Sequence, residues 1–395
     1  MPKLVFDTSK ITDIPAFLKL CPFGALYEKD GKVDANAACK MCKICVKKGP
    51  AGAATFVEDE VKAQVNKAEW NGVTVYVDHE DGKIHPVTFE LIGKARELAG
   101  KIGHKVCAIF IGSNITESAE ELLHYGTDEV YVYDDPALQH YIPELYTAVF
   151  ESYIKKNKPS SILVGATTTG RELAPRIAAR FKTGLTADCT ILDMAENTDL
   201  IQIRPAFGGN IMAQIYTPNS RPQLATVRYK VMNSPERTED ANGKIIPCTV
   251  DGIDLTTTTK ILDISPKQKV KTIESADVIV AVGRGIKSEA DLAMAKELAD
   301  LVGGELACTR PLIEAGWMEA KNQIGLSGRT VRPKLIICLG ISGAVQFSAG
   351  MNNSDFIFAI NKDENAPIFK VANYGIVGDI YEIVPQLIEK IKEGK

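Results

Sequence analysis

From Val73 onward, the sequence alternates between short apolar stretches typical of buried strands and longer stretches with helical spacing. The apolar stretches are VTVYV, KVCAIFIG, EVYVY and SILVG, and the helical ones are VTFELIGKARELAGK, residues 116–125, residues 143–156 and GRELAPRIAARF. Strands that alternate with helices predict a parallel sheet covered by helices on both faces. The order of these stretches therefore predicts an α/β fold for most of the chain.

A polar stretch near residues 251–270, DGIDLTTTTKILDISPKQKV, interrupts the alternation and has the composition of a linker. Beyond it the alternation restarts with ADVIVAVGRG, SEADLAMAKELADLVGG, GELACTR, KLIICLG, FIFAIN and GDIYEIVPQLIEKIK. At 395 residues the chain is too long for one typical domain. We expect an N-terminal α+β module over residues 1–66 and two doubly wound parallel-sheet domains over residues 67–260 and 261–395.

The N-terminal fifty residues contain a cysteine pattern typical of an iron–sulfur site. Cys39, Cys42 and Cys45 have the C-x2-C-x2-C spacing of bacterial ferredoxins, and Cys21 is followed by proline, as is the fourth cysteine of such a run. In ferredoxins with two clusters, this fourth cysteine ligates the cluster of the other run. The pattern predicts a ferredoxin-like module with one [4Fe–4S] cluster bound by Cys21, Cys39, Cys42 and Cys45.

The four ligand positions of the second ferredoxin cluster fall on Ile11, Ile14, Phe17 and Gly49. Loss of one complete ligand set is what removal of a whole cluster predicts, because apolar side chains can fill the vacated volume. Zinc sites usually pair two C-x2-4-C knuckles. Disulfides are disfavoured because MPKLVFDTSK has no apolar signal core, so a reducing cytoplasm is the expected location.

The charge of the chain narrows its possible partners. A net charge of −4 and no apolar run of membrane-spanning length argue against nucleic acid and membrane as partners. The first fifty residues differ, with nine lysines against five acidic residues. This excess is either a solvated surface or, around Lys40, Lys43, Lys47 and Lys48, a docking patch for an acidic redox partner such as a soluble ferredoxin.

Four segments of the last domain place Gly, Ser, Thr or Arg directly after strand-like runs: VGRGIKSE, CTRPL, QIGLSGRT and LGISGAVQ. Ligands of open α/β sheets bind at the carboxyl ends of strands, and helix N-termini attract phosphate. The segments together favour a diphosphate ligand. All five histidines precede the linker, so this domain contains no histidine to act as a general base. The domain therefore resembles a cofactor holder more than a hydrolase.

From about Trp70 to the C-terminus the sequence resembles the alpha subunit of electron-transferring flavoproteins. The resemblance is carried by GATTTGRELAPRIAARFKTGLTADC, RPAFGGN, VAVGRGIKSE, GLSGRTVRPKLIICLGISGAVQFSAGM and AINKDENAPIFKVANYGIVGD. A ferredoxin-like extension ahead of this subunit is similar to electron-bifurcating complexes of anaerobes, most of all the caffeyl-CoA reductase complex. A lactate dehydrogenase complex with the same extension is the nearest alternative.

The resemblance implies that residues 261–395 bind FAD. It places Arg284 over the isoalloxazine, where a fixed cation favours reduced, anionic flavin, and it places Thr309 at a phosphate, beside Arg310. The other implied cofactor residues are Gln323, Ile324, Gly325, Leu326 and Ser327 along the flavin and ribityl chain, Ser342, Gly343, Ala344, Val345, Gln346 and Phe347 at a helix N-terminus that receives the diphosphate, and Asn361 and Asp379 at the adenosine end.

One of these positions departs from the family, which often has a histidine where this chain has Phe347. That histidine donates a hydrogen bond to the pyrimidine edge of the flavin. Phenylalanine has no such donor. We therefore expect Phe347 to support a reduced, anionic flavin less well.

The resemblance also implies a heterodimer with a beta subunit that carries a second flavin or AMP and, in bifurcating members, binds NADH. Arg171 and Arg204 are either side chains that reach this second flavin or ordinary surface arginines. One electron would pass through the cluster to ferredoxin, and the other through FAD to an acyl-CoA dehydrogenase-type reductase, with the linker as a hinge. Two alternatives stay open: a non-bifurcating carrier, or a cluster module that serves only docking.

Overall fold

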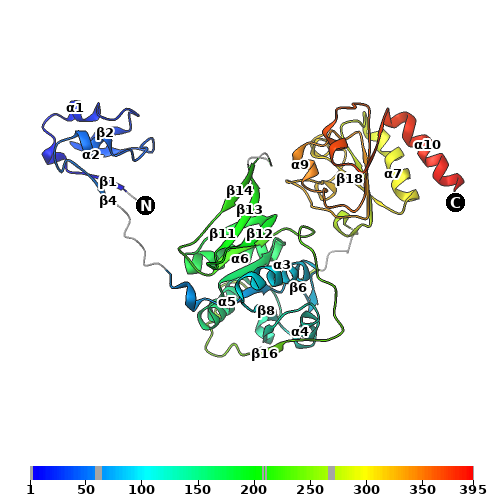
Figure 1. The fold of residues 1–395 in the computed structure, drawn as a ribbon, viewed down its shortest axis with the longest axis horizontal. Helices are drawn as coiled ribbons and strands as arrows, with labels where there is room; N and C mark the ends of the chain where they lie inside the picture. Colours follow the sequence, from blue (N-terminus) through cyan, green and yellow to red (C-terminus); the bar gives the residue numbers. More distant parts are fainter. Residues whose placement is uncertain (1–2, 58–64, 207–208, 210, 266–271, 395) are drawn as a thin grey trace. The chain divides into compact units, whose positions relative to one another are not determined.

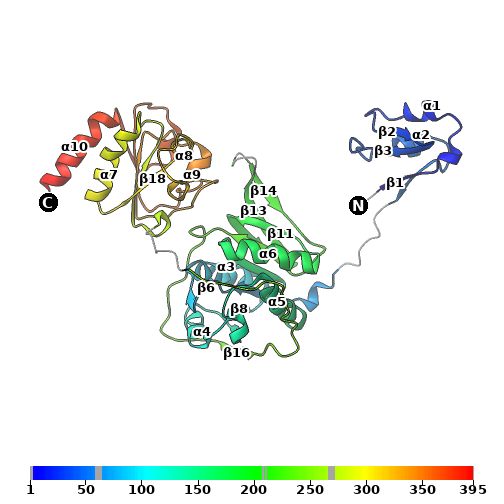
Figure 2. The ribbon, with the colours of Figure 1, turned by 180° about the vertical axis from the view of Figure 1, so that it is seen from behind.

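The computed structural model describes residues 3–57, 65–206, 209, 211–265 and 272–394. They belong to two compact units, Met1–Val65 and Asn66–Lys395. The first unit is a small α+β module, and the second contains two parallel sheets (Figures 1 and 2). Among the described residues, no helix has the length and apolar character needed to cross a membrane.

The N-terminal module follows the order strand, helix, strand, strand, helix, strand. Strand β1 (Lys3–Phe6) pairs antiparallel with β4 (Ala54–Val57), and β2 (Leu26–Lys29) forms a hairpin with β3 (Lys32–Ala35). Between them lie α1 (Ile14–Leu18) and α2 (Ile44–Lys48). This arrangement confirms the predicted ferredoxin-like module.

The segment from 51 to 70 has helical spacing, but residues 54–57 form strand β4. Residues 54–57 are a strand because pairing with β1 closes the module, and this long-range pairing leaves no trace in local periodicity. The middle of the segment, 58–64, lies outside the described residues.

The middle of the chain forms a seven-stranded sheet, all of whose pairings are parallel. In spatial order the strands are β11 (Leu185–Cys189), β15 (Gln223–Val227), β10 (Ser161–Gly165), β5 (Val73–Tyr76), β8 (Val106–Gly112), β9 (Glu129–Asp134) and β16 (Lys244–Cys248). A second, antiparallel sheet contains β12 (Ile191–Met194), β13 (Leu200–Ala206) and β14 (Ile211–Ile215).

Helices cover both faces of the seven-stranded sheet, because side chains alternate between the faces along each strand. Phe110 of β8 belongs to a core cluster with α3 (Val87–Ile102) and α4 (Thr116–Leu123). Its neighbour Ile109 belongs to another cluster with α5 (Pro143–Asn157) and α6 (Thr168–Phe181). The doubly wound arrangement expected from the sequence is confirmed.

The C-terminal sheet is parallel throughout, in the order β18 (Glu305–Cys308), β17 (Val278–Val282), β19 (Leu335–Leu339), β20 (Ile357–Asn361) and β21 (Tyr374–Val377). Helices α7 (Leu292–Leu301) and α10 (Ile380–Glu393) lie side by side on one face, and α9 (Val345–Ser348) lies on the other (Figures 1 and 2). Helix α8 (Arg310–Glu314) follows β18. This sheet is also doubly wound, as expected.

The predicted linker contains no helix or strand in its described part, residues 251–265. The first residues of the linker belong to the preceding domain, because Ile253 and Leu255 pack against the hydrophobic core beneath α5 and α6. The proposed boundaries at 66/67 and 260/261 remain predictions.

Candidate functional site: a cavity at the strand ends and a four-cysteine array

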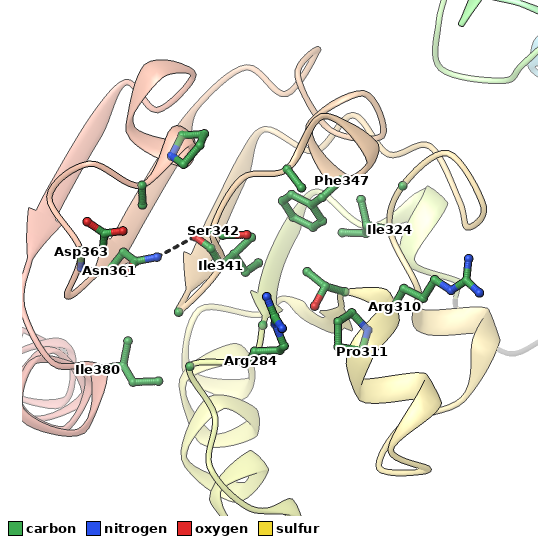
Figure 3. Close-up of a pocket in the computed structure, with 18 of the residues that line it drawn as sticks. Arg284, Arg310, Pro311, Ile324, Ile341, Ser342, Phe347, Asn361, Asp363 and Ile380 are labelled. Carbon is green, nitrogen blue, oxygen red and sulfur yellow. Dashed lines mark hydrogen bonds between the residues drawn. The ribbon is translucent and has the colours of Figure 1, made fainter. Parts of the chain in front are cut away.

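The carboxyl ends of the five C-terminal strands open onto one cavity of about 590 Å³ (Figure 3). Ligand pockets commonly measure about 300–1,000 Å³. The segments that follow β17, β18, β19, β20 and β21 all contribute lining residues. The cavity thus lies where ligands of open parallel sheets bind.

All but three of the predicted cofactor residues line this cavity. Those that line it are Arg284, Thr309, Arg310, Gln323, Ile324, Gly325, Ser327, Ser342, Ala344, Gln346, Phe347, Asn361 and Asp379.

Leu326, Gly343 and Val345 do not line the cavity. Val345 is 51% exposed, and the backbone of Gly343 packs so closely on Ile368 that a Cβ there would lie 2.2 Å from the Ile368 nitrogen. Of the segment predicted to form a helix N-terminus from Ser342, only a single turn, α9, is helical, and it begins at Val345. The path of the backbone in this irregular turn decides which side chains face the cavity.

Other lining residues were missed, although most stand beside residues that were predicted. The additional ones are Gly283, Gly285, Lys287, Pro311, Gly340, Ile341, Lys362, Asp363, Ala366, Pro367, Gly378 and Ile380. The signal that could have found them is their position, since nearly all follow a strand directly.

Arg284 and Arg310 are the two predicted arginines of the cavity lining. Arg284 is exposed, points toward the middle of the cavity in Figure 3, and forms no salt bridge with any described residue. Arg310, in contrast, is paired through its Nε with Glu314 at 2.8 Å and points away. Both arginines line the cavity, and of the two only Arg310 has a salt-bridge partner among the described residues.

The polar turns around the cavity are held by short internal hydrogen bonds. Gln323 donates from Nε2 to the hydroxyl of Ser327 at 2.8 Å, and Asn361 donates from Nδ2 to the carbonyl of Ile341 at 2.9 Å (Figure 3). The turns after β17 and β19 touch through glycine, since a Cβ on Gly285 would lie 2.5 Å from the Cα of Gly340. These contacts fix the cavity before any ligand arrives.

In the N-terminal module the four predicted cluster cysteines line one small cavity. Cys45 is buried, Cys42 is exposed, and Cys21 and Cys39 lie between these extremes. Burial raises the pKa of the Cys21 thiol, but backbone N–H donors of residues 23–26 outweigh burial and lower it overall. One of these donors, the N–H of Ala25, lies 3.4 Å from the Cys21 sulfur. Hydrogen bonds to sulfur are a feature of iron–sulfur ligands.

The array supplies four thiols, the donor type of both iron–sulfur clusters and tetrahedral zinc sites. The described residues contain no group of three or more His, Cys, Asp or Glu side chains gathered for one metal ion. Sulfurs on tetrahedral zinc would lie about 3.8 Å apart, given a Zn–S bond of about 2.3 Å. The enclosed space is about 10 Å³, roughly one water molecule. Residues 39–43, which carry Cys39 and Cys42, form no helix or strand.

The four positions that correspond to the ligands of the second ferredoxin cluster lie in or against packed core. Ile11 and Phe17 are buried in the core of the module, and Ile14 packs against it. A Cβ added to Gly49 would lie 2.6 Å from the Phe17 ring, so the ring occupies the space of a side chain at position 49. This packing supports the interpretation that one complete cluster site has become hydrophobic core.

Arg171 is held within its own domain. Its guanidinium pairs with Asp188 at 3.2 Å, and Asp188 also pairs with Arg228 at 3.0 Å. Arg204 contacts the carbonyl of Pro205 at 3.4 Å. Neither contact requires a second flavin, so the two interpretations of these arginines stay open.

Comparison with known proteins places the chain in a family. The electron transfer flavoprotein domain matches residues 73–251, and the electron transfer flavoprotein FAD-binding domain matches residues 272–352. The lactate dehydrogenase (NAD(+),ferredoxin) subunit LctC of Acetobacterium woodii is 58% identical over 390 residues, covering 99% of this chain and 93% of that protein. An electron transfer flavoprotein subunit alpha of Thermoanaerobacterium thermosaccharolyticum is 47% identical over 328 residues, covering 83% of this chain and 99% of that protein.

A third relative, the acryloyl-CoA reductase electron transfer subunit beta of Anaerotignum propionicum, is 41% identical over 362 residues, covering 84% of this chain and 99% of that protein. The chain is thus similar to its relatives over most of their length, and both family domains match it. The domain matched as FAD-binding also has a cavity at the ends of its strands. The chain belongs to the electron transfer flavoprotein family, as an alpha subunit whose C-terminal domain is the FAD-binding domain.

Proposed function

We propose that this chain is the alpha subunit of an electron-bifurcating complex, with FAD in the C-terminal cavity and one [4Fe–4S] cluster on Cys21, Cys39, Cys42 and Cys45. The observation that carries the proposal is the four-cysteine cavity in a chain that also has the FAD-binding domain. The proposed partners are a beta subunit that receives electrons from NADH, a soluble ferredoxin and a dehydrogenase. The cytoplasm is the proposed location.

The extent of similarity supports lactate dehydrogenase as the partner enzyme in place of caffeyl-CoA reductase. The relative named as a lactate dehydrogenase subunit covers 99% of this chain, whereas the electron transfer flavoprotein alpha subunit covers 83%. This difference in coverage is about the length of the N-terminal unit, Met1–Val65. An acyl-CoA dehydrogenase-type reductase is the second candidate, favoured by the 41% identity to the acryloyl-CoA reductase subunit.

Bound FAD would exchange electrons singly or in pairs, and this chain would determine how stable its reduced form is. Arg284 has a guanidinium without a salt-bridge partner among the described residues and lines the cavity, so it offers positive charge to a reduced flavin. The turns held by Gln323 and Asn361 keep the cavity in shape and reduce reorganisation on binding.

The first experiment is to measure iron, acid-labile sulfide and flavin in anaerobically purified full chain, with low-temperature EPR after reduction. We expect about four irons and four sulfides per chain with the signal of a reduced cubane. Zinc, or no metal in protein that retains FAD, would leave an electron transfer flavoprotein subunit with a docking module.

The second experiment tests bifurcation in the complex assembled with its beta subunit and dehydrogenase. Lactate-dependent NAD⁺ reduction that requires reduced ferredoxin supports the lactate enzyme, and ferredoxin-coupled reduction of an enoyl-CoA supports the second candidate. A complex that transfers electrons with no ferredoxin requirement is a non-bifurcating carrier.

A Cys42→Ser variant separates a conducting cluster from a structural one. If the cluster conducts, the assembled variant should lose ferredoxin turnover while it keeps FAD. If the variant still turns over ferredoxin, the module serves only docking.

If ferredoxin docks on the exposed Lys40, Lys47 and Lys48, its attraction to this module should weaken as salt is added, since screening acts within about 10 Å at 0.1 M ionic strength.

A further inference from the structure

A tyrosine outside the cavity lining joins two of the segments that form the cavity. Tyr381 lies in the first turn of α10, directly after the lining residues Asp379 and Ile380. Its hydroxyl accepts a hydrogen bond from the backbone N–H of Lys287 at 2.8 Å and donates one to the Asp291 carboxylate at 2.8 Å. Lys287 is itself a lining residue, from the turn after β17.

The two joined segments do not come from neighbouring strands. Strands β17 and β21 are separated in the sheet by β19 and β20. At about 4.8 Å per strand, their ends lie roughly 14 Å apart. The Tyr381 contacts therefore span two intervening strand ends, along the side where α7 and α10 pack together.

The same tyrosine also restrains the charged end of Lys287. The Lys287 ammonium lies 4.5 Å from the centre of the Tyr381 ring, within the range of a cation–π contact. Asp291 is fixed in turn, because it accepts hydrogen bonds from the Ser288 N–H at 3.0 Å and the Ser288 hydroxyl at 2.8 Å. A lysine on an exposed loop usually loses side-chain entropy when it binds an anion. The contact with the Tyr381 ring already restricts the Lys287 side chain, so less entropy remains to be lost on binding.

We propose that Tyr381 is a positioning residue for the cofactor: it holds the β17 turn against α10 and presents the Lys287 ammonium to the diphosphate of bound FAD. The inference rests on the proposed orientation of FAD, with its adenosine half toward Asn361 and Asp379. Tyr381 acts through Lys287 and is not itself a lining residue.

The test uses flavin-depleted full chain and two probes, FAD and ADP, which carries the diphosphate and adenosine without the flavin. Tyr381→Phe removes the hydroxyl and keeps the ring, and Tyr381→Leu removes both. One hydrogen bond contributes about 0.5–1.5 kcal/mol and tenfold in affinity is about 1.4 kcal/mol. We expect the dissociation constants of FAD and ADP to rise about fivefold in Tyr381→Phe and by tenfold or more in Tyr381→Leu.

A double-mutant cycle distinguishes positioning from a general loss of stability. In a Lys287→Gln background, Tyr381→Leu should have little further effect on ADP affinity, because the cation that it positions is already absent. The matched control is Tyr374→Leu, an exposed tyrosine of β21 outside the cavity lining, which should leave both affinities unchanged. Unfolding midpoints of the flavin-free proteins identify any variant that fails to fold.

Three outcomes overturn the inference or one of its premises. Equal losses of ADP affinity for Tyr381→Leu with and without Lys287 would mean that Tyr381 does not act through that lysine. If the unmodified chain binds FAD but not ADP at any concentration tested, the proposed orientation of the cofactor is wrong, whatever the variants do. If the unmodified chain binds no FAD, the proposed FAD site itself is wrong.

Discussion

Replacing Phe347 with a hydrogen-bond donor should raise the reduction potential of the bound flavin for its first electron. Phe347 lines the cavity from α9 and is only 5% exposed, so a donor placed there acts where water competes weakly. A hydrogen bond to a charged group is worth about 1.5–3 kcal/mol, and it acts once the first electron has brought negative charge to the ring. Because about 1.4 kcal/mol corresponds to 59 mV for one electron, the expected rise is about 65–130 mV.

The assay is a spectroelectrochemical titration of the full chain carrying Phe347→His or Phe347→Asn, after flavin content has been measured. Phe347 also belongs to the hydrophobic core on the α9 face, so some loss of stability is expected in both variants. Phe356→His is the control, since Phe356 is 38% exposed and does not line the cavity. If both variants retain FAD at an unchanged first-electron potential, the reasoning about position 347 is refuted.

Three further predictions concern the N-terminal module and a buried ion pair. In metal-free protein, Cys21 should be alkylated at lower pH than Cys45, because N–H donors lower the pKa of the Cys21 thiol whereas burial raises the pKa of the Cys45 thiol; equal pH profiles by mass spectrometry would contradict this. Gly49→Ala should cost the module about 1–3 kcal/mol, because the added Cβ would lie 2.5 Å from the Cys45 carbonyl oxygen and 2.6 Å from the Phe17 ring; we expect faster amide exchange that Phe17→Leu partly restores, and unchanged exchange would contradict this. Asp199→Ala should lower the free energy of unfolding by about 3–5 kcal/mol, because the fully buried Arg221 loses its 2.8 Å carboxylate partner; a denaturant titration showing less than 1 kcal/mol would contradict this.

Much of the fold could be predicted because its signals are local. A strand such as VCAIFIG, buried on both faces, has a continuous apolar run, and a helix such as α7 has a periodic apolar stripe. The strand β4 was harder, because residues 54–57 are strand only through their pairing with β1. The predictable part of this fold is thus the part in which each element carries its own pattern.

The candidate site was predictable to a similar limit. Position after a strand indicated four of the segments around the cavity, and the family resemblance indicated Arg284 and Asn361, which both line it. Position after a strand did not indicate that Val345 turns outward, because side-chain direction in an irregular turn depends on backbone angles. Nor could it reveal the contact between Tyr381 and Lys287, which lie 94 residues apart and follow strands that are not neighbours.

Packing in the N-terminal module limits how many electrons the proposed cluster site can carry. A cysteine at position 49 would place its Cβ 2.6 Å from the Phe17 ring, so restoring one ligand cannot restore the second cluster. A module with one [4Fe–4S] cluster passes one electron at a time. If the proposed beta subunit takes electrons from NADH as a pair, these electrons would have to be separated before they reach the proposed cluster, and flavin is the cofactor that can separate them. The packing of Phe17 at the second cluster position therefore suits a module that accepts single electrons from a flavin better than one that holds two electrons at once.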